Sequence, residues 1–380
     1  MARIPFNRPS VVGREYEYLQ AAVAGRHLSG NGPFTKRCQQ WLEQKTTCRL
    51  ALLTTSCTVA LEMAALLLNL EPGDEVIMPS FAFVSTANAF VLRRAVPVFV
   101  DVRPDTLNID ETKIEAAMTP RTRAIVALHY AGVGCEMDSI GALAARRGAA
   151  VVEDAAQCIL ASYRGRPLGS FGRFGALSFH ETKNVIAGEG GALLVNDAAD
   201  AERAEIIWEK GTNRSQFFRG RTEKYTWLDV GSSYLPSEVT AAFLQAQIEE
   251  ADRLAAERMR LWQRYHAELE PLERLGVLRR PIVPEHCQHN AHIYYVLLPT
   301  SKVRDDLLTA LRSGGIDAVF HYVPLHSSPA GRRYARQAGD LCVTDDLASR
   351  LVRLPLWVGM TDGQIGTVAE AIRRELDVAR

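Results

Sequence analysis

The chain has 380 residues, of which 47% are hydrophobic and 23% are charged. These values are typical of a globular protein, and the length exceeds that of a single hydrophobic core, so we expect two domains. Lysine plus arginine and aspartate plus glutamate are balanced at 44 each. The chain therefore lacks the net positive charge that would favour a nucleic acid or an anionic membrane as a partner. An anionic ligand has to be held by local groups.

The sequence shows no pattern of a membrane or exported protein. Its longest apolar run, residues 59–70, is too short to cross a bilayer and contains Glu62. The first ten residues lack the apolar core of a signal peptide. Seven cysteines without a CxxC spacing argue against a disulfide framework and a zinc knuckle. We expect a cytoplasmic protein with reduced thiols that are mostly buried.

The first half of the chain alternates between helical and strand-like segments. Two amphipathic segments, 14–24 and 34–45, predict helices. Strand-like runs then follow at 50–53, 75–78, 97–102, 124–129 and 149–152, and helical stretches at 58–70, 85–92, 111–118 and 138–147. This alternation predicts a parallel sheet with helices on both faces, in which ligands bind at the carboxyl ends of the strands.

The second half predicts a smaller α/β domain. A helix at 201–210 is followed by a loop at 211–234 that is rich in arginines and aromatic residues, and by a long helix at 237–269. Strands are then predicted at 293–298 and 318–322, and helices at 302–312, 345–352 and 362–378. We place the domain boundary within the long helix, which gives a large domain, 1–245, and a small domain, 246–380.

The stretch LSFHETKNVIAGEGGALL, residues 177–194, contains a single lysine, Lys183. The apolar run 174–179 and the glycines after Lys183 predict a strand, an exposed turn and a second strand. Gly190 and Gly191 allow a close backbone approach or a positive φ. A lysine on such a turn can point into a cleft, and the alternative is an ordinary solvated surface lysine.

The run AAVVEDAAQ ends a buried strand with Glu153 and Asp154 and places Gln157 three residues further on. A carboxylate at the carboxyl end of a central strand is typical of a ligand site, because burying it unpaired is costly. The alternative is an Asp that caps the next helix.

Two further segments follow predicted strands. TTSCT places Ser56, Cys57 and Thr58 at the start of a helix, whose free backbone N–H groups favour an anion. Plain capping by Ser56 or Thr58 is the alternative. PSFAF places Phe83 near a strand end, where it either lines a site or belongs to the core.

The motifs SFHETKN, GEGG and EDAAQ resemble those of the DegT/StrS sugar aminotransferases, which use pyridoxal phosphate (PLP). The resemblance runs from IPFNRP to RLPLW, which is nearly the whole chain. It implies an α/β protein of the PLP-dependent aspartate-aminotransferase fold (fold type I), with a mostly parallel central sheet and a smaller C-terminal domain.

The resemblance also implies roles for individual residues. Lys183 would form the Schiff base with PLP, and Asp154 would keep the ring nitrogen protonated so that the cofactor acts as an electron sink. Gln157 would contact the phenolic oxygen of the ring. The phosphate would be held by Ser178 and by the segment Ser56, Cys57 and Thr58, in which Cys57 occupies a slot that is glycine in the family. Phe83 would stack on the ring.

Substrate contacts are predicted from polar and aromatic residues near these motifs. The loop 211–234 contains Arg214, Arg219, Arg221 and Lys224, which suit a diphosphate, and the alternative is a solvated surface. Our candidates are His180, Arg219 and His321, the last because the segment FHYVPLH resembles a family segment that lines the active-site cleft. His286, His289 and His292 are spaced three apart, a spacing that does not converge on one face of a strand, so we predict no metal site.

The resemblance implies a homodimer with shared active sites. Many relatives read GYKYN in a segment whose Asn reaches the phosphate of the neighbouring subunit. Here the segment is GSSYLP, with Leu235 at that position, and Ser232 or Ser233 is the alternative contact.

Blocks such as FVDVRPDTLNIDE and KGTNRSQFFRG are similar to the branch of transaminases that make dTDP-4-amino-4,6-dideoxygalactose, or the glucose epimer. The implied reaction moves the amino group of L-glutamate to C4 of dTDP-4-dehydro-6-deoxy-D-glucose. Two alternatives are a PLP-dependent nucleotide-sugar dehydratase and a non-catalytic regulatory protein of the same fold. Lys183 argues against the first, because such dehydratases carry histidine there. Lys183, Asp154 and Gln157 together argue against the second.

Overall fold

The computed structural model describes residues 3–378 of the chain. Its centre is an eight-stranded sheet in the order β1 (Leu50–Thr54), β9 (Gly191–Val195), β8 (Phe174–Ser178), β5 (Ala150–Asp154), β4 (Thr122–Leu128), β2 (Glu75–Pro79), β3 (Val96–Val100) and β12 (Arg336–Gln337). From β8 to β12 the neighbours are parallel, whereas β9 is antiparallel to both β1 and β8. The predicted α/β fold with a mostly parallel central sheet is therefore confirmed.

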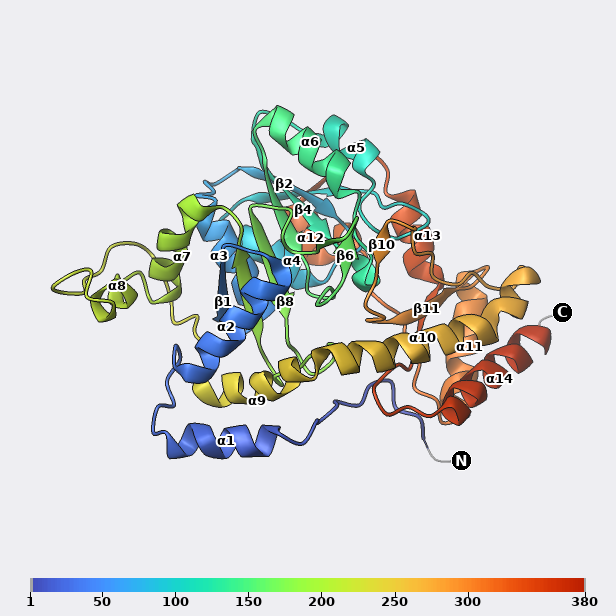
Figure 1. Cartoon of the computed structure of the whole chain (residues 1–380). Helices are drawn as coiled ribbons and strands as arrows, with labels where there is room; N and C mark the ends of the chain where they lie inside the picture. Colours follow the sequence, from blue (N-terminus) through green and yellow to red (C-terminus); the bar gives the residue numbers. More distant parts are fainter. Residues whose placement is uncertain (1–2, 379–380) are drawn as a thin grey trace.

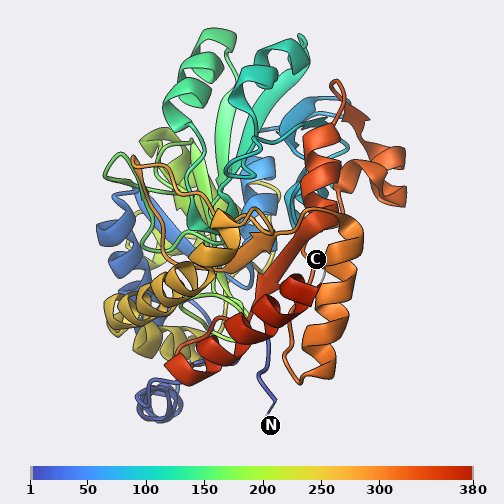
Figure 2. The same cartoon turned by 90° about the vertical axis from the view of Figure 1, so that its right-hand side faces the viewer.

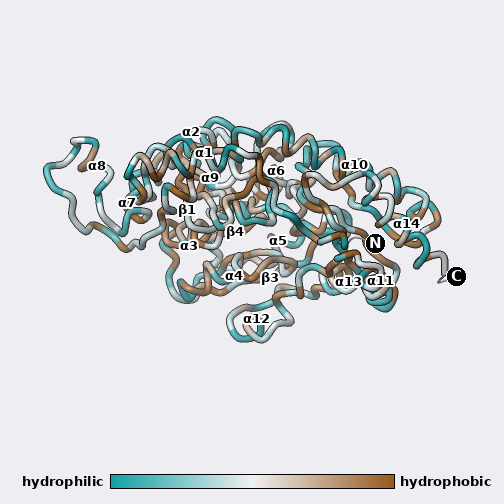
Figure 3. Tube along the Cα trace, turned by 90° about the horizontal axis from the view of Figure 1, so that it is seen from below, coloured by the Kyte–Doolittle hydropathy of each residue, from teal (hydrophilic) through white to brown (hydrophobic). Residues whose placement is uncertain are grey.

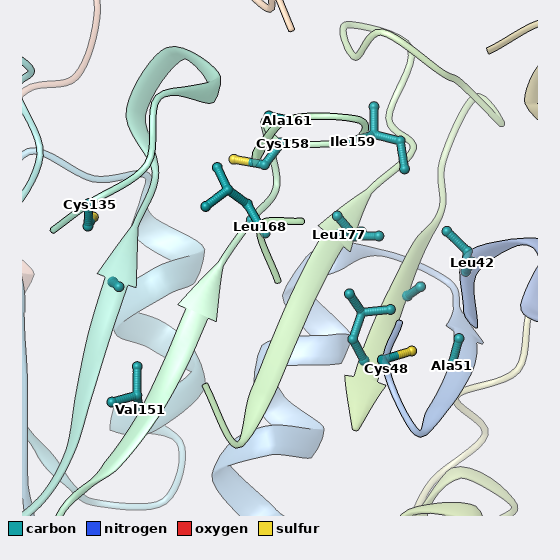
Figure 4. Packing of buried hydrophobic residues seen from close by; sticks show 14 of the residues in the cluster. Leu42, Cys48, Ala51, Cys135, Val151, Cys158, Ile159, Ala161, Leu168 and Leu177 are labelled. Carbon is teal, nitrogen blue, oxygen red and sulfur yellow. The ribbon is translucent and has the colours of Figure 1, made fainter. Parts of the chain in front are cut away.

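Helices cover both faces of the central sheet (Figure 1). One buried cluster joins it to α2 (Pro33–Thr46), α5 (Glu111–Ala117), α6 (Met137–Arg147) and α9 (Glu238–Glu249), and α1 (Glu15–Ala24) packs outside α9. A second cluster joins it to α3 (Cys57–Leu67), α4 (Val84–Val91) and α7 (Ala201–Trp208). Figure 4 shows part of the first cluster, with Leu42 of α2 beside Ala51 of β1. Burial on both faces explains why the strands are continuous apolar runs in the sequence.

The C-terminal part has a third hydrophobic cluster of its own, with Leu269, Val296 and Leu307 at its centre. This cluster joins β11 (Tyr294–Leu297) and its antiparallel partner β13 (Leu351–Leu354) to α10 (Ala251–Arg274), α11 (Ser301–Ser313) and α14 (Asp362–Val378). Helix α13 (Cys342–Arg350) instead buries Leu347 in the second cluster. Figure 2 shows α11 in orange and α14 in red beside this strand pair. The domain boundary near residue 245 stays a prediction.

The predicted long helix at 237–269 is wrong in detail, because it is two helices that meet at Glu250. Glu250 leaves the helical conformation with φ −103° and ψ 6°. Helix α9 buries Ala241 and Leu244 in the cluster of the central sheet, whereas α10 buries Trp262 and Leu269 in the C-terminal cluster. The bend lets each helix follow its own core.

Two further predictions in the C-terminal part differ from the structure, a strand that is absent and a helix whose end is misplaced. Residues 318–322 form no strand, because only Val319 pairs, with Arg353, before the chain turns away. The predicted helix at 345–352 ends at Arg350, since the next four residues pair with β11. A leucine-rich segment that continues a helical pattern does not reveal that tertiary pairing from sequence alone.

The loop at 211–234 contains a short helix that the sequence did not predict, α8 (Arg214–Phe218). Figures 1 and 3 both place it away from the rest of the molecule, at the end opposite α14. The aromatic side chains of Phe218 and Trp227 in this loop are largely exposed. Smaller elements are β6 (Ser162–Tyr163), β7 (Arg166–Pro167), β10 (Cys287–Gln288) and α12 (Pro329–Tyr334). Within residues 3–378, every helix is too short or too polar to span a bilayer.

Candidate active site

A cavity of about 550 Å³ lies where β5 and β8 end and α3 and α4 begin. Predicted site residues from distant parts of the chain line it together: Ser56, Cys57, Thr58, Phe83, Asp154, Gln157, Ser178, His180, Lys183 and His321. The cavity thus lies at the carboxyl ends of parallel strands, where ligands of such sheets bind. Its volume is that of a typical small-molecule site.

Lys183 lies on the turn between β8 and β9 and points into the cavity. The turn is held by hydrogen bonds from the Lys183 N–H to the His180 carbonyl (2.9 Å) and from the Glu181 N–H to the Gly188 carbonyl (2.8 Å). Burial lowers the pKa of the Lys183 amine, although the neighbouring Cys57 and Asp154 act in the opposite direction. The side chain is therefore not the solvated surface lysine of the alternative interpretation.

Asp154 ends β5 and presents its carboxylate to the same cavity. Its Oδ2 accepts a hydrogen bond from the Thr86 hydroxyl (2.6 Å), and its Oδ1 accepts one from the Ala156 N–H (3.2 Å). No helix begins after Asp154 before β6, so the helix-capping alternative is wrong. The carboxylate keeps acceptor capacity for a cationic group in the cavity.

Gln157 is oriented by two hydrogen bonds. Its Oε1 accepts from the Ala131 N–H (2.7 Å), and its Nε2 donates to the Tyr322 hydroxyl (3.1 Å). The side-chain amide is thus fixed at the wall of the cavity, with Tyr322 as its neighbour.

The N-terminus of α3 faces the cavity. Ser56 caps this helix, since its hydroxyl accepts a hydrogen bond from the Val59 N–H (3.2 Å). Within residues 3–378, the N–H groups of Cys57 and Thr58 make no hydrogen bond, so both can bind an anion. A Cβ at Gly191 would lie 2.4 Å from the Cys57 nitrogen, so the close approach of β9 to this helix requires glycine.

The two phenylalanines after β2 have different environments. Phe81 is buried in the core (1% exposed), whereas Phe83 is 55% exposed and lines the cavity. Phe83 is therefore available to a ligand, as the first of its two interpretations requires.

His321 stacks on Tyr322 with ring centres 3.7 Å apart, and its Nδ1 lies 2.5 Å from the Tyr130 hydroxyl.

Arg219 does not line this cavity. It forms an ion pair with Glu205 and lies in a separate hollow with Arg221. The three closely spaced histidines also have separate environments: His286 pairs with Glu136, His289 packs on Trp262, and His292 lies 3.1 Å from the Asn184 oxygen. Substrate contact by Arg219 stays a prediction.

Sequence reasoning missed Thr86, Tyr322 and Arg353 as cavity residues. Each comes from a segment far in sequence from the motif residue that it accompanies. Arg353 is the first residue of the block RLPLW, but nothing in that block predicted a cavity residue. Thr86 is one of two hydroxyl residues at the start of α4, and its contact with Asp154 distinguishes it from Ser85.

A sequence model of the DegT/DnrJ/EryC1/StrS aminotransferase family matches residues 9–373. The chain belongs to this family. The family match covers both the strand-end motifs of the central sheet and the C-terminal part with β11 and β13, so every residue that lines the cavity except Phe6 lies within it. The protein is accordingly an aminotransferase that depends on PLP.

Individual relatives of this DegT/DnrJ/EryC1/StrS aminotransferase agree in length and fold. The spore coat polysaccharide biosynthesis protein SpsC of Bacillus subtilis is 30% identical over 378 residues, which cover 97% of this chain and 96% of SpsC. The aminotransferase TlmJ of Streptoalloteichus hindustanus is 29% identical with a TM-score of 0.91, and 100% of each chain is covered. DesV of S. venezuelae is 28% identical with a TM-score of 0.89, and 99% of each chain is covered.

The cavity of this aminotransferase fits PLP. The amine of Lys183 makes no hydrogen bond or ion pair within residues 3–378 and is free for covalent attachment of an aldehyde. The free N–H groups at the start of α3 suit a phosphate, and the Asp154 carboxylate suits a protonated ring nitrogen. The amine, the N–H groups and the carboxylate thus suit the aldehyde, the phosphate and the ring nitrogen of the cofactor, respectively.

Proposed function

We propose that this enzyme is a nucleotide-sugar aminotransferase that moves the amino group of L-glutamate to C4 of dTDP-4-dehydro-6-deoxy-D-glucose. The product would be a dTDP-4-amino-4,6-dideoxyhexose. The observation that carries the proposal is that the Lys183 amine, which has no partner within residues 3–378, and the Asp154 carboxylate line one cavity in a chain of this family. The similarity to SpsC, a spore coat polysaccharide biosynthesis protein, supports a sugar substrate.

PLP, when bound, supplies an electron sink that makes a proton on the neighbouring substrate carbon acidic. Lys183 would take that proton and return it one atom further along, acting as general base and then as general acid. Because burial lowers its pKa, a larger fraction of its amine is neutral near pH 7 than in a solvated lysine.

Asp154 would hold the positive charge of the ring nitrogen, and Thr86 would keep the carboxylate in place. Gln157 would donate to the phenolic oxygen, with Tyr322 as the partner that orients its amide. Ser178 and the start of α3, with Ser56, Cys57 and Thr58, would bind the phosphate, and Phe83 would cover one face of the ring.

The two substrates would use one cavity in turn. Glutamate would react first and leave as 2-oxoglutarate, and the keto sugar would then accept the amino group, in a ping-pong scheme. His180 and His321 line the cavity and are proposed sugar contacts. We further propose a cytoplasmic homodimer, in which Arg219 and the loop with α8 would act at the partner's site.

The proposal is tested by incubating the purified holoenzyme with L-glutamate, with and without dTDP-4-dehydro-6-deoxyglucose. We expect glutamate alone to change the visible absorbance of the bound cofactor and to release 2-oxoglutarate stoichiometrically. Adding the keto sugar should restore the spectrum and yield a 4-amino sugar by NMR. Release of 2-oxoglutarate without an aminated product from this sugar would overturn the substrate assignment.

The same experiment separates the two alternatives. A nucleotide-sugar dehydratase would remove a hydroxyl group from the sugar without transferring nitrogen from glutamate. A regulatory protein would show no turnover at all. Lys183 speaks against both, because its amine is free and lies in the cavity.

A further inference from the structure

Arg353 is the only arginine that lines the active-site cavity within residues 3–378. It lies on β13, where its backbone is paired on both sides. On one side, Tyr295 of β11 lies opposite Arg353 in the register. On the other side, the Arg353 N–H donates to the Val319 carbonyl (2.7 Å). Its place beside the cavity is therefore set by the C-terminal part of the chain, whereas Lys183 belongs to the central sheet.

The guanidinium of Arg353 lacks an anionic partner within the described chain. Its Nε is buried and makes no hydrogen bond. Burial lowers the pKa of the guanidinium, and the groups that act in the opposite direction are the hydroxyls of Tyr130 and Tyr322, not a carboxylate. Arg258 is a contrasting case, because it is also buried but donates to the Ala291 and His292 carbonyls (3.1 and 2.5 Å). A buried guanidinium without such acceptors is expected to receive an anion.

The residues around Arg353 add positive charge or no charge. Burial lowers the pKa values of His321 and His292 well below the ordinary value of a histidine, so both rings are neutral near pH 7. The Lys183 amine lies close enough for the Arg353 charge to lower its pKa further, after the effect of burial. An anion at this end of the cavity would therefore meet two basic groups, Arg353 and Lys183.

The N-terminal segment holds the guanidinium in position. Phe6 lies with its ring 4.9 Å from the Arg353 Cζ. Next to it, Asn7 Nδ2 donates to the Glu181 carbonyl (3.3 Å) on the lysine turn, and Trp357 Nε1 donates to the Pro5 carbonyl (3.1 Å). Phe6 is thus fixed between the lysine turn and the C-terminal part, and it covers one face of the guanidinium.

We propose that Arg353 binds the α-carboxylate of the amino donor, an inference that rests on the proposed function. An amino acid carries this carboxylate on the same carbon as its amine, so the carboxylate must lie close to the Lys183 amine while the amino group is transferred. A guanidinium matches a carboxylate with two parallel hydrogen bonds. The free N–H groups at the start of α3 are a separate place for the cofactor phosphate.

The test compares Arg353→Met and Arg353→Lys with the wild-type holoenzyme. Arg312→Met is the matched control, because it removes an exposed guanidinium from the end of α11, away from the cavity. Single-turnover rates are measured with L-glutamate, with L-alanine and with ethylamine, which lacks a carboxylate. The rate with dTDP-4-dehydro-6-deoxyglucose is measured on enzyme already loaded with the amino group. Thermal unfolding of each variant shows that it is folded.

We expect Arg353→Met to weaken binding of L-glutamate and L-alanine by on the order of 100-fold, because the carboxylate loses a charged partner. The slow reaction with ethylamine and the reaction with the keto sugar should stay within about threefold of wild type. Arg353→Lys should recover part of the loss, and Arg312→Met should show none. Removing an unpaired buried charge should not lower the unfolding temperature.

Three results would overturn the inference alone. The first is unchanged binding of both amino acids in Arg353→Met. The second is a loss confined to the keto sugar, which would assign Arg353 to the diphosphate. The third is a loss for L-glutamate but not for L-alanine, which would assign it to the distal carboxylate. A wild-type enzyme that reacts with none of the amino acids would instead overturn the proposed function and this inference with it.

Discussion

Glu153 and Asp154 are neighbouring carboxylates at the end of β5 with opposite environments. Glu153 is fully buried and accepts hydrogen bonds from three backbone N–H groups, those of Gly169 (2.7 Å), Phe171 (2.6 Å) and Gly172 (2.7 Å). His129 donates a fourth through Nε2 (3.0 Å), since its Nδ1 accepts from the Cys135 N–H. Asp154 has one hydroxyl and one N–H as partners and faces the cavity.

The difference between the two carboxylates separates a structural anion from one that is available to a ligand. Side chains alternate across a strand, so consecutive residues point to opposite faces of the sheet. Glu153 fastens the loop after β7 to the sheet, and its acceptor sites are filled by the protein. Asp154 keeps free acceptor sites where a cationic ring nitrogen would lie. We therefore expect substitutions on the Asp154 face to affect catalysis and substitutions of Glu153 to affect folding.

The largest effect should come from Lys183, which shares the cavity with Asp154. Lys183→Met removes both the attachment point of the cofactor and the proton carrier, so we expect turnover to fall by at least about 10³-fold. Steady-state assays with L-glutamate and the keto sugar measure this. Added ethylamine provides a further check, because a small amine that partly restores turnover identifies the lost group as the base.

The lowered pKa of Lys183 also predicts a pH effect on the apoprotein. Between its folded pKa and its unfolded pKa of about 10.4, the unfolded state binds more protons, so stability rises with pH through that window. At any pH below the unfolded pKa, the cost of desolvating the charged amine therefore destabilises the fold. Lys183→Met should be more stable than the wild type to urea at pH 7, and the difference should shrink near pH 10. A less stable variant at pH 7 would contradict this.

Asp154→Asn should come next. The amide cannot hold the ring nitrogen in its protonated form, so we expect kcat to fall by about 10²- to 10³-fold while PLP still binds. The free energy of unfolding should change by less than about 1 kcal/mol, because the amide oxygen can accept from the Ala156 N–H while the amide nitrogen donates to the Thr86 hydroxyl. Kinetics, cofactor absorbance and urea unfolding measure the three quantities. Near-full activity in this variant would remove Asp154 from the mechanism.

Glu153→Gln should show the reverse pattern. An amide leaves at least one of the three N–H donors facing another donor, and we expect a loss of about 3 kcal/mol in the free energy of unfolding. The folded fraction should keep kcat within about twofold of wild type. Urea unfolding and active-site titration distinguish the two effects. If Glu153→Gln lowered kcat as Asp154→Asn does, the separation between the two faces would be wrong.

The sequence sufficed for the residues that stand at strand ends and failed for those brought to them by tertiary packing. Lys183 and Asp154 follow buried apolar strands, and ligands of parallel sheets bind at that edge, so local pattern and topology together predicted where they lie. Thr86 meets Asp154 across 68 residues of sequence, and Arg353 lies on a strand that was predicted as helix and loop. Such contacts depend on how α4 and β13 pack, which periodicity does not encode.

The smallest predicted effect concerns Thr86, whose hydroxyl donates to Asp154. Glu153, in contrast, is held mainly by backbone N–H groups. Thr86 is fully buried, so Thr86→Val removes the 2.6 Å hydrogen bond with little change in volume. We expect kcat/KM to fall about tenfold, since a hydrogen bond to a charged group contributes roughly 1.5–3 kcal/mol. Thr86→Ser keeps the hydroxyl and should stay within about threefold of wild type. Equal losses in the two variants would show that the methyl group, and hence packing of α4, matters instead of the hydrogen bond to Asp154.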